Sequence, residues 1–494
     1  MDQNKTPLVT ALMKYVTDKT IPFHVPGHKQ GRGNHELEAL LGSTCLNIDL
    51  TCLEDTDNIC NPVSVIHEAQ KLAAEIYGAE EAFFLTNGTT SGIQAMILSV
   101  CEPGDKIIIP RNAHKSAIGG IILSGAEPIY IEPEIHDYYG IAMGITPEAL
   151  RETLAINPDV KAVFVINPSY YGIASDLKAI VEIAHSYDVP VIVDEAHGAH
   201  LIFDDRLPLS AMEAGADLSA SSTHKLGGSL TQSSILLQQG NLISPKRVKN
   251  ALNLTQTTSP SYILLASLDI ARKQLALHGR EMIERTYDLA MEARQKLQQI
   301  PGLQVMDTDV LGQNGCVALD PTKIVVNVRA LGLSGYEVEK ILRKKYHLQV
   351  ELSDLFNIIA LVSLGDNQET IDYLVNALSE IAGAQSIKNV VKYYTPVPSI
   401  PEAVVSPRSA YYADTKVLPL EEAEGEISAE AIMAYPPGIP IVCPGERITR
   451  EVIDYVNVLR NEYAILQGTE DPEVKNIKVL VNRILLVHTQ EHLA

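Results

Sequence analysis

Residues 161–200, "KAVFVINPSYYGIASDLKAIVEIAHSYDVPVIVDEAHGAH", hold two short apolar runs on either side of a segment with helical periodicity. The runs at 161–168 and 190–196 are rich in Val and Ile, as buried strands are. Two strands joined by a helix predict a parallel pair, because a parallel connection needs a long crossover. Further runs of this kind occur at 81–86, 106–110, 128–133, 217–222 and 234–238. Together they predict an α/β fold with a mostly parallel sheet covered on both faces.

The chain has 494 residues, enough for two or three domains. We expect an N-terminal segment over 1–60 and a large domain over 61–300 that ends in a long helix from about 260 to 300. Residues 301–385 predict a smaller α+β domain. A Pro-rich stretch, 393–412, then precedes a compact C-terminal domain, so that we assign this domain to 386–494.

Composition narrows the class of protein. The chain is 46% hydrophobic and 20% charged, which is typical of a soluble globular protein. Its formal charge of −22 disfavours nucleic acid as a partner, because such binding depends on Lys and Arg. The N-terminus does not resemble a secretory signal, and no apolar run approaches the roughly 18 residues of a membrane span. Six scattered cysteines without CxxC spacing indicate free thiols in the cytoplasm.

The end of the second strand, "VDEAHGAH" (193–200), suggests two chemistries that the rest of the chain does not support. DEAH is also a helicase motif, but a helicase needs a G-x-x-x-x-G-K-[ST] phosphate loop, and the sequence contains none. His197 and His200 are three residues apart, so a helix could bring both to one face as zinc ligands. No H-E-x-x-H or second ligand cluster completes such a set, so we expect no metal.

A lysine downstream of this strand indicates a third chemistry. Lys225 lies in "SASSTHKLGGSLTQSS", among small hydroxyl residues and glycines. Because few charges surround it, desolvation would lower the pKa of its amine and make the amine a nucleophile toward aldehydes. Taken alone, a surface lysine in a Ser-rich loop is the simpler interpretation. Together with Asp194 at a strand end, however, Lys225 supplies the two groups that pyridoxal phosphate requires, one for its ring nitrogen and one for its aldehyde.

That cofactor also needs a phosphate site. The stretch "FFLTNGTTSGIQAMIL" places Thr89, Thr90 and Ser91 between a strand and a helix, where backbone N–H groups favour an anion. An ordinary capped helix would explain the same residues. His114, just after the strand at 106–110, is placed to lie flat on a cofactor ring or to be a polar loop residue.

These residues together resemble the pyridoxal-phosphate-dependent ornithine/lysine/arginine decarboxylases, whose large domain has the fold-type-I, aspartate-aminotransferase-like fold. The strongest match is the lysine signature "ASSTHKLGGSLTQSS" (220–234). Further matches are "FHVPGHKQG" (23–31), "IIIPRNAHKS" (107–116), "VINPSYYG" (165–172), "VDEAHGAH" (193–200) and two stretches near the C-terminus, 406–430 and 434–449. The chain is most similar to the short biosynthetic arginine decarboxylases, which lack the N-terminal wing domain.

The resemblance implies a role for each matching residue. Lys225 would hold the cofactor as a Schiff base, Asp194 would pair with the ring nitrogen, and His114 would stack on the ring. Ala196 and His197 would lie beside or under the ring. The phosphate would be bound by hydroxyl and imidazole groups, namely Thr89, Thr90, Ser222 and His224, with Ser91 a further candidate.

The implied reaction is α-decarboxylation of a small basic amino acid, in a homodimer or higher homo-oligomer with its active site at the subunit interface. Arginine, giving agmatine for polyamine synthesis, is the first choice, and lysine or ornithine is the alternative. The distal cation of the substrate needs a carboxylate, and the candidates are Asp55, Asp57, Asp354 and Glu446, each of which could instead be structural. An aminotransferase, with Arg329 or Arg343 binding the substrate carboxylate, and a non-catalytic regulator on the same fold remain open.

Overall fold

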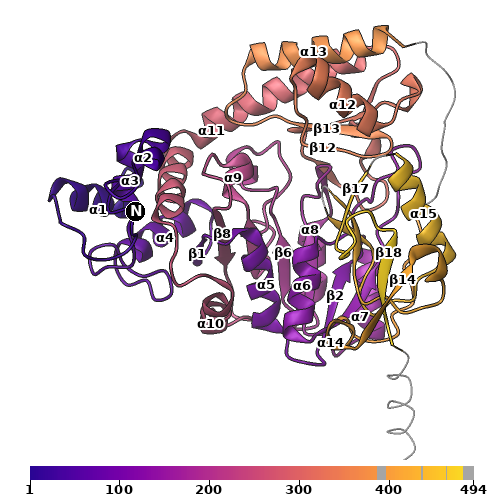
Figure 1. Ribbon diagram of the computed structural model, residues 1–494, viewed down its shortest axis with the longest axis horizontal. Coiled ribbons are helices and arrows are strands. Elements are labelled where there is room, and N and C mark those ends of the chain that lie inside the picture. Colours follow the sequence, from indigo (N-terminus) through magenta and orange to yellow (C-terminus); the bar gives the residue numbers. More distant parts are fainter. Residues whose placement is uncertain (386–396, 436–437, 463, 482–494) are drawn as a thin grey trace, which may run out of the picture.

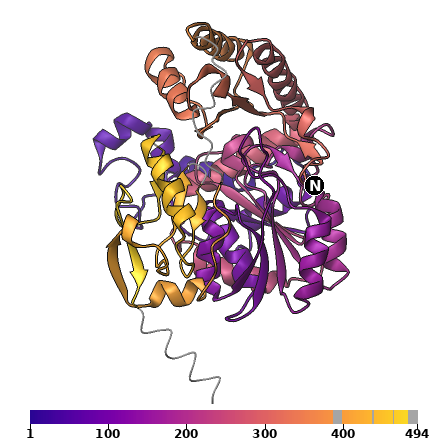
Figure 2. The ribbon, with the colours of Figure 1, turned by 90° about the vertical axis from the view of Figure 1, so that its right-hand side faces the viewer.

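The computed structural model describes residues 1–385, 397–435, 438–462 and 464–481 (Figure 1). The boundary that the sequence predicts at 386 and the end of the chain from 482 lie outside these residues. Three bodies follow one another along the chain in Figures 1 and 2, a large domain, a smaller one above it and a C-terminal one at its side.

A seven-stranded sheet forms the centre of the large domain, in the order β1-β8-β7-β6-β4-β2-β3. Its strands are β1 (Glu81–Leu85), β2 (Lys106–Pro110), β3 (Glu127–Ile131), β4 (Ala162–Ile166), β6 (Val191–Asp194), β7 (Leu218–Ser221) and β8 (Ser234–Gln238). β2, β3, β4, β6 and β7 pair in parallel, and β8 runs antiparallel to both of its neighbours. The seven runs in the sequence thus form the expected strands, and the predicted mostly parallel sheet is confirmed.

Helices cover both faces of this sheet because successive strand residues point to opposite sides. Ile107 and Ile109 belong to the apolar cluster on one face, and Ile108 belongs to the cluster on the other. The first face is covered by α5 (Gly88–Val100), α6 (Lys115–Ser124) and α10 (Pro245–Thr255). The second is covered by α1 (Pro7–Thr17), α4 (Val65–Ile76), α7 (Pro147–Ile156), α8 (Leu177–His185) and the first half of α11 (Tyr262–Gln298).

Glycine lets α5 lie close to the sheet. A Cβ at Gly92 would stand 2.7 Å from Leu85 Cδ1 and 3.2 Å from Ala220 Cβ. The start of α5 is therefore held against the carboxyl ends of β1 and β7. The short α9 (Thr223–Leu226) follows β7 at the same edge, and α2 (His35–Leu41) and α3 (Ser43–Ile48) belong to the N-terminal segment.

The long helix α11 runs from the large domain into the small one, as the sequence predicts (Figure 1). The small domain contains an antiparallel sheet in the order β12-β13-β11-β9, with helices packed on it. Its elements are β9 (Gln304–Val305), β11 (Lys323–Asn327), β12 (Leu352–Ser353), β13 (Asn357–Leu361), α12 (Gly335–Tyr346) and α13 (Gln368–Gly383). A separate pair, β10 (Ala318–Leu319) with β5 (Ile173–Ala174), joins the small domain to the large one.

The C-terminal domain lies against the large domain on the side of α6 (Figure 2). Its described residues form a β14-β18 pair, a β16-β15-β17 sheet and two helices. Their bounds are α14 (Pro407–Tyr412), β14 (Thr415–Pro419), β15 (Ile432–Tyr435), β16 (Ile439–Val442), α15 (Arg450–Asn461), β17 (Ile465–Gln467) and β18 (Asn476–Leu480). An ion pair between Arg111, just after β2, and Glu446 fastens this domain beside the edge where the parallel strands end.

Candidate active site

A pocket of about 380 Å³ lies where the parallel strands of the large domain end. Loops after β1, β2, β4, β6 and β7 contribute to it, as expected for a ligand site of an open α/β sheet. Nine of the predicted cofactor residues line it, namely Thr89, Thr90, His114, Asp194, Ala196, His197, Ser222, His224 and Lys225. The fold therefore brings together side chains that are far apart in the sequence.

Lys225 projects from α9 into this pocket. Its Nζ lies 2.7 Å from His197 Nε2 and 5.3 Å from the centre of the Tyr170 ring. Burial lowers the pKa of the Lys225 amine to about 8, against the opposing effect of Asp194. A considerable fraction of the amine is thus neutral near pH 7–8, and a neutral amine can attack an aldehyde.

Asp194, the last residue of β6, is buried in the wall of the same pocket. Its Oδ1 accepts a hydrogen bond of 3.1 Å from the Ala196 backbone amide, and burial raises its pKa to about 6. A buried carboxylate of this kind is stabilised by a cationic ligand. Its neighbour Glu195 points elsewhere, since its carboxylate accepts a 2.7 Å hydrogen bond from the Ala211 amide.

Hydroxyl groups gather at the start of α5. Thr89 Oγ1 lies 2.6 Å from Ser222 Oγ and 2.9 Å from Ser234 Oγ, so that three chain segments meet at one point. These groups stand beside the N-terminus of a 13-residue helix, where backbone N–H groups and the helix dipole favour an anion. Ser91 does not line the pocket, and its hydroxyl donates to the Gly88 carbonyl at 2.9 Å.

Aromatic and imidazole rings form the remaining walls. His114 caps α6, and its Nδ1 accepts a 3.2 Å hydrogen bond from the Ser116 amide. Burial lowers the pKa of His114 to about 4, so the ring is neutral and carries its proton on Nε2. The rings of Tyr170 and His197 lie 4.3 Å apart, and burial holds the pKa of His197 well below its usual range.

The four acids predicted to bind a distal cation lie elsewhere. Asp55 is exposed, and Asp57 accepts hydrogen bonds from the backbone amide of the next residue and from three amides at the start of α4. Asp354 accepts a 3.0 Å hydrogen bond from the Tyr171 hydroxyl, and burial raises its pKa. Glu446 is paired with Arg111 at 2.8 Å. None of the four is among the described residues that line the pocket.

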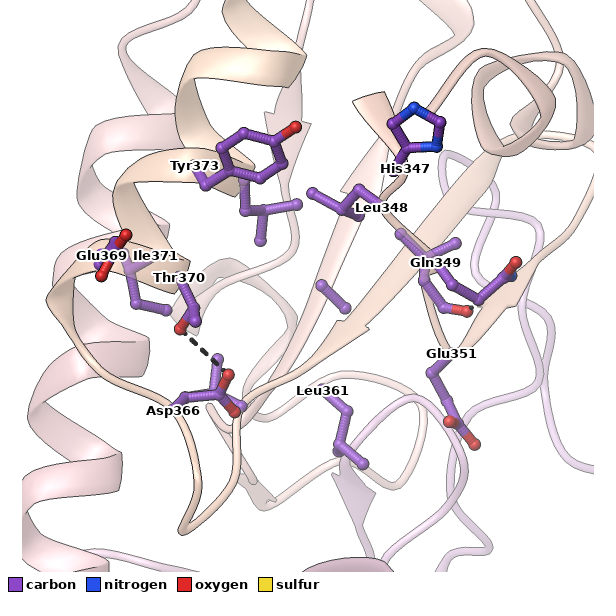
Figure 3. Close-up of a pocket in the computed structure, with 14 residues that line it drawn as sticks. His347, Leu348, Gln349, Glu351, Leu361, Asp366, Glu369, Thr370, Ile371 and Tyr373 are labelled. Atoms are coloured by element: carbon purple, nitrogen blue, oxygen red, sulfur yellow. Dashed lines mark hydrogen bonds between the residues drawn. The ribbon is translucent and has the colours of Figure 1, made fainter. Parts of the chain in front are cut away.

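A different acid, Glu351, does line the pocket. It precedes β12 of the small domain, and its Oε1 accepts a 2.8 Å hydrogen bond from the Tyr170 hydroxyl. Glu351 also forms part of the wall of a larger hollow on the small domain, of about 830 Å³, which is drawn in Figure 3. Glu351 could not be predicted from the sequence, because a single acid before a short strand carries no distinguishing pattern.

The described residues show neither a metal cluster nor a membrane-spanning helix. These residues contain no group of three or more His, Cys, Asp or Glu side chains that could hold a metal ion. None of their helices is long and apolar enough to cross a membrane. All six cysteines lie in the described part of the chain and are free thiols, as the sequence predicts.

Comparison with known proteins gives a consistent result. Residues 6–370 match the model of the Orn/Lys/Arg decarboxylase major domain, and residues 389–473 match that of the C-terminal domain of the same family. An arginine decarboxylase of Bacillus subtilis is 50% identical over 97% of this chain and 99% of its own length. One from Halalkalibacterium halodurans is 47% identical over 97% of this chain and 98% of its own. The solved Francisella novicida lysine decarboxylase LdcF superposes with a TM-score of 0.84 at 23% identity, covering 96% of this chain and 81% of that one, which shows a shared fold.

Proposed function

Since the chain belongs to the Orn/Lys/Arg decarboxylase family, we propose that it is a pyridoxal-phosphate-dependent enzyme that converts L-arginine to agmatine and CO2. The assignment of pyridoxal phosphate as the cofactor rests on the presence of Lys225 and Asp194 in one pocket with a hydroxyl-lined helix N-terminus. The choice of arginine rests on relatives named arginine decarboxylase at 45–50% identity over 90% or more of this chain.

The residues of the pocket fit this cofactor. The hydroxyls of Thr89 and Ser222 and the amides at the start of α5 would hold its phosphate, with Thr90 and His224 beside them. Buried Asp194 would pair with the ring nitrogen, and the Lys225 amine would bond to the aldehyde carbon. His114, Ala196 and His197 would line the two sides of the ring.

When bound, pyridoxal phosphate supplies an aldehyde for the substrate amine and a ring that accepts the electron pair released as CO2 leaves. Asp194 would keep a proton on the ring nitrogen, because a carboxylate in a buried site stabilises positive charge beside it. Lys225 would be the residue that holds the cofactor covalently when no substrate is bound. Its amine can release and accept a proton near neutral pH because burial has lowered its pKa to about 8.

We propose that the Glu351 carboxylate binds the distal cation of the substrate. It is the carboxylate other than Asp194 among the described residues that line the pocket, and the Tyr170 hydroxyl holds one of its oxygens at 2.8 Å. Its negative charge acts on the Lys225 amine, raising the pKa of that group against the effect of burial. A planar guanidinium needs such a partner, because carboxylate oxygens match its paired N–H donors.

We also propose that the enzyme is cytoplasmic and forms a homodimer. Free cysteines are consistent with a cytoplasmic enzyme that meets small basic amino acids rather than nucleic acid or membrane. Large exposed apolar side chains near the N-terminus, including Ile21, Phe23 and Val25, are consistent with burial in a homodimer. Analytical ultracentrifugation of the full chain would test the dimer.

A substrate panel tests the proposed reaction. CO2 and amine would be quantified from arginine, lysine and ornithine side by side, with Lys225→Ala as the inactive variant and Lys296→Ala, a surface lysine, as its control. We expect equimolar CO2 and agmatine, with arginine giving the highest kcat/KM. Formation of a keto acid without CO2 would contradict decarboxylation, and preference for lysine or ornithine would contradict the substrate.

A further inference from the structure

A cluster of ionisable side chains is buried where the small domain meets the turn after β6. Asp320 and His200 are 0% exposed and Lys323 is 1% exposed, and none of the three lines the active-site pocket in the described residues. Lys323 begins β11, and Asp320 lies in the turn between β10 and β11. His200 belongs to the segment after β6 that also carries His197.

The contacts of this cluster form a continuous path. Lys323 Nζ forms an ion pair with Asp320 Oδ2, and the same oxygen lies 3.0 Å from His200 Nε2. Asp320 Oδ1 accepts from the Thr322 hydroxyl at 2.6 Å. The Lys323 ammonium also donates a 3.2 Å hydrogen bond to the backbone carbonyl of His197. His197 in turn contacts Lys225, since its Nε2 lies 2.7 Å from the Lys225 amine.

Asp320 belongs to the small domain, and a backbone contact with the large domain fixes its position. The Asp320 amide donates a 2.8 Å hydrogen bond to the Gly172 carbonyl of the large domain. Gly172 has φ +85°, and a Cβ there would stand 2.7 Å from the Asp320 carbonyl oxygen, so this approach requires glycine. Removing one member of such a buried pair leaves the other charge without compensation. The cluster is therefore held rigidly against the segment that carries His197.

We infer that Lys323, held by Asp320 and His200, is a positioning residue for the catalytic lysine, because its ammonium binds the His197 carbonyl and so fixes the imidazole that contacts the Lys225 amine. This inference rests on the proposed function of Lys225 in binding the cofactor. Through this contact Lys323, which does not itself line the pocket, sets the geometry and the charge around Lys225.

Electrostatics support the same role. The positive charge of Lys323 adds to burial in lowering the pKa of the Lys225 amine and that of His197. Burial alone would raise the pKa of Asp320, but Lys323 and His200 outweigh it and hold that pKa far below its usual range. Among the described residues, ionisable groups from several elements face Lys225 and Lys323, namely His114, Tyr170, Asp194, His197, His200, His224, Arg294, Asp320 and Glu351.

The test measures how fast cofactor-free full-length protein takes up pyridoxal phosphate at different pH values, followed by its visible absorption. Lys323→Met removes the positive charge, so the midpoint of the pH profile should rise by about one pH unit, because the Lys225 amine becomes a stronger base. Asp320→Asn leaves Lys323 uncompensated, so the midpoint should move in the opposite direction. Lys323→Arg keeps the charge and should restore the wild-type midpoint.

The pair Asp269 and Arg272 provides a matched control. It has the same spacing and is also 0% exposed, but it fixes the N-terminal segment through Arg272, which donates to the carbonyls of Gln3 and Lys5. Arg272→Met should lower the melting temperature and leave the pH midpoint unchanged. If Lys323→Met lowers the melting temperature without moving the midpoint, or moves it in the same direction as Asp320→Asn, the positioning role is wrong. Wild-type protein that takes up no cofactor would overturn the proposed function first.

Discussion

Replacing Glu351 by Gln tests the assignment of the distal cation. The substitution keeps the shape of the side chain and one acceptor for the Tyr170 hydroxyl, which now lies 2.8 Å from Oε1, but removes the charge. At an effective dielectric constant of about 20, two unit charges about 4 Å apart interact by about 4 kcal/mol. Glu351 is exposed in this structure, so solvent reduces that value, and a charged hydrogen bond of roughly 1.5–3 kcal/mol is the better guide.

That free energy corresponds to a loss of roughly 10- to 150-fold in kcat/KM for arginine. Steady-state kinetics with coupled CO2 detection would measure it. Asp366→Asn is the matched control, because Asp366 lines the neighbouring hollow in Figure 3 and accepts from the Ser363 amide at 2.8 Å. The assignment is refuted if Glu351→Gln stays within twofold of wild type, or if Asp366→Asn loses as much activity.

Three other predictions follow from single contacts. Tyr170→Phe removes the hydroxyl that orients Glu351, so kcat/KM for arginine should fall about two- to tenfold, which steady-state kinetics would show against Tyr187→Phe as an exposed control. Glu446→Gln leaves the buried Arg111 guanidinium without its carboxylate, at a cost of about 3–5 kcal/mol; calorimetry should show a melting temperature several degrees lower, and an unchanged one would contradict the role of this pair in domain docking. Uptake of pyridoxal phosphate should accelerate as pH rises to about 8 and then level off, since the pKa of the Lys225 amine is lowered to about 8; a rate that continues to rise to pH 10 would mean an ordinary lysine.

The sequence predicted the sheet and most of the pocket because both depend on local patterns. Val- and Ile-rich runs such as 190–196 become strands, and carboxyl ends of parallel strands meet at one edge, which brings Asp194 near Lys225. The position of Glu351 in the pocket could not be predicted, because it depends on how the small domain packs on the large one. The ion pair of Glu446 could not be predicted either, because its partner Arg111 lies in another domain, 335 residues away along the chain.

Ser91 illustrates a different limit. It occurs in the predicted phosphate segment, but helical geometry turns its side chain back to the Gly88 carbonyl, while Thr89 faces Ser222. Residues one or two positions apart at a helix start point in different directions, and the sequence alone does not say which of them face the ligand. The roles of Thr89 and Ser91 in binding phosphate therefore stay predictions that cofactor titration of Thr89→Val and Ser91→Ala would separate.

The central claim is that Lys225 holds pyridoxal phosphate covalently in the pocket beside Asp194. Reducing the purified holoenzyme with borohydride and mapping its peptides by mass spectrometry tests this directly. We expect one modified lysine per chain, Lys225, in the peptide that contains "STHKLGG". Modification of another lysine, such as Lys115 or Lys323, or recovery of wild-type protein without any modified lysine, would contradict it.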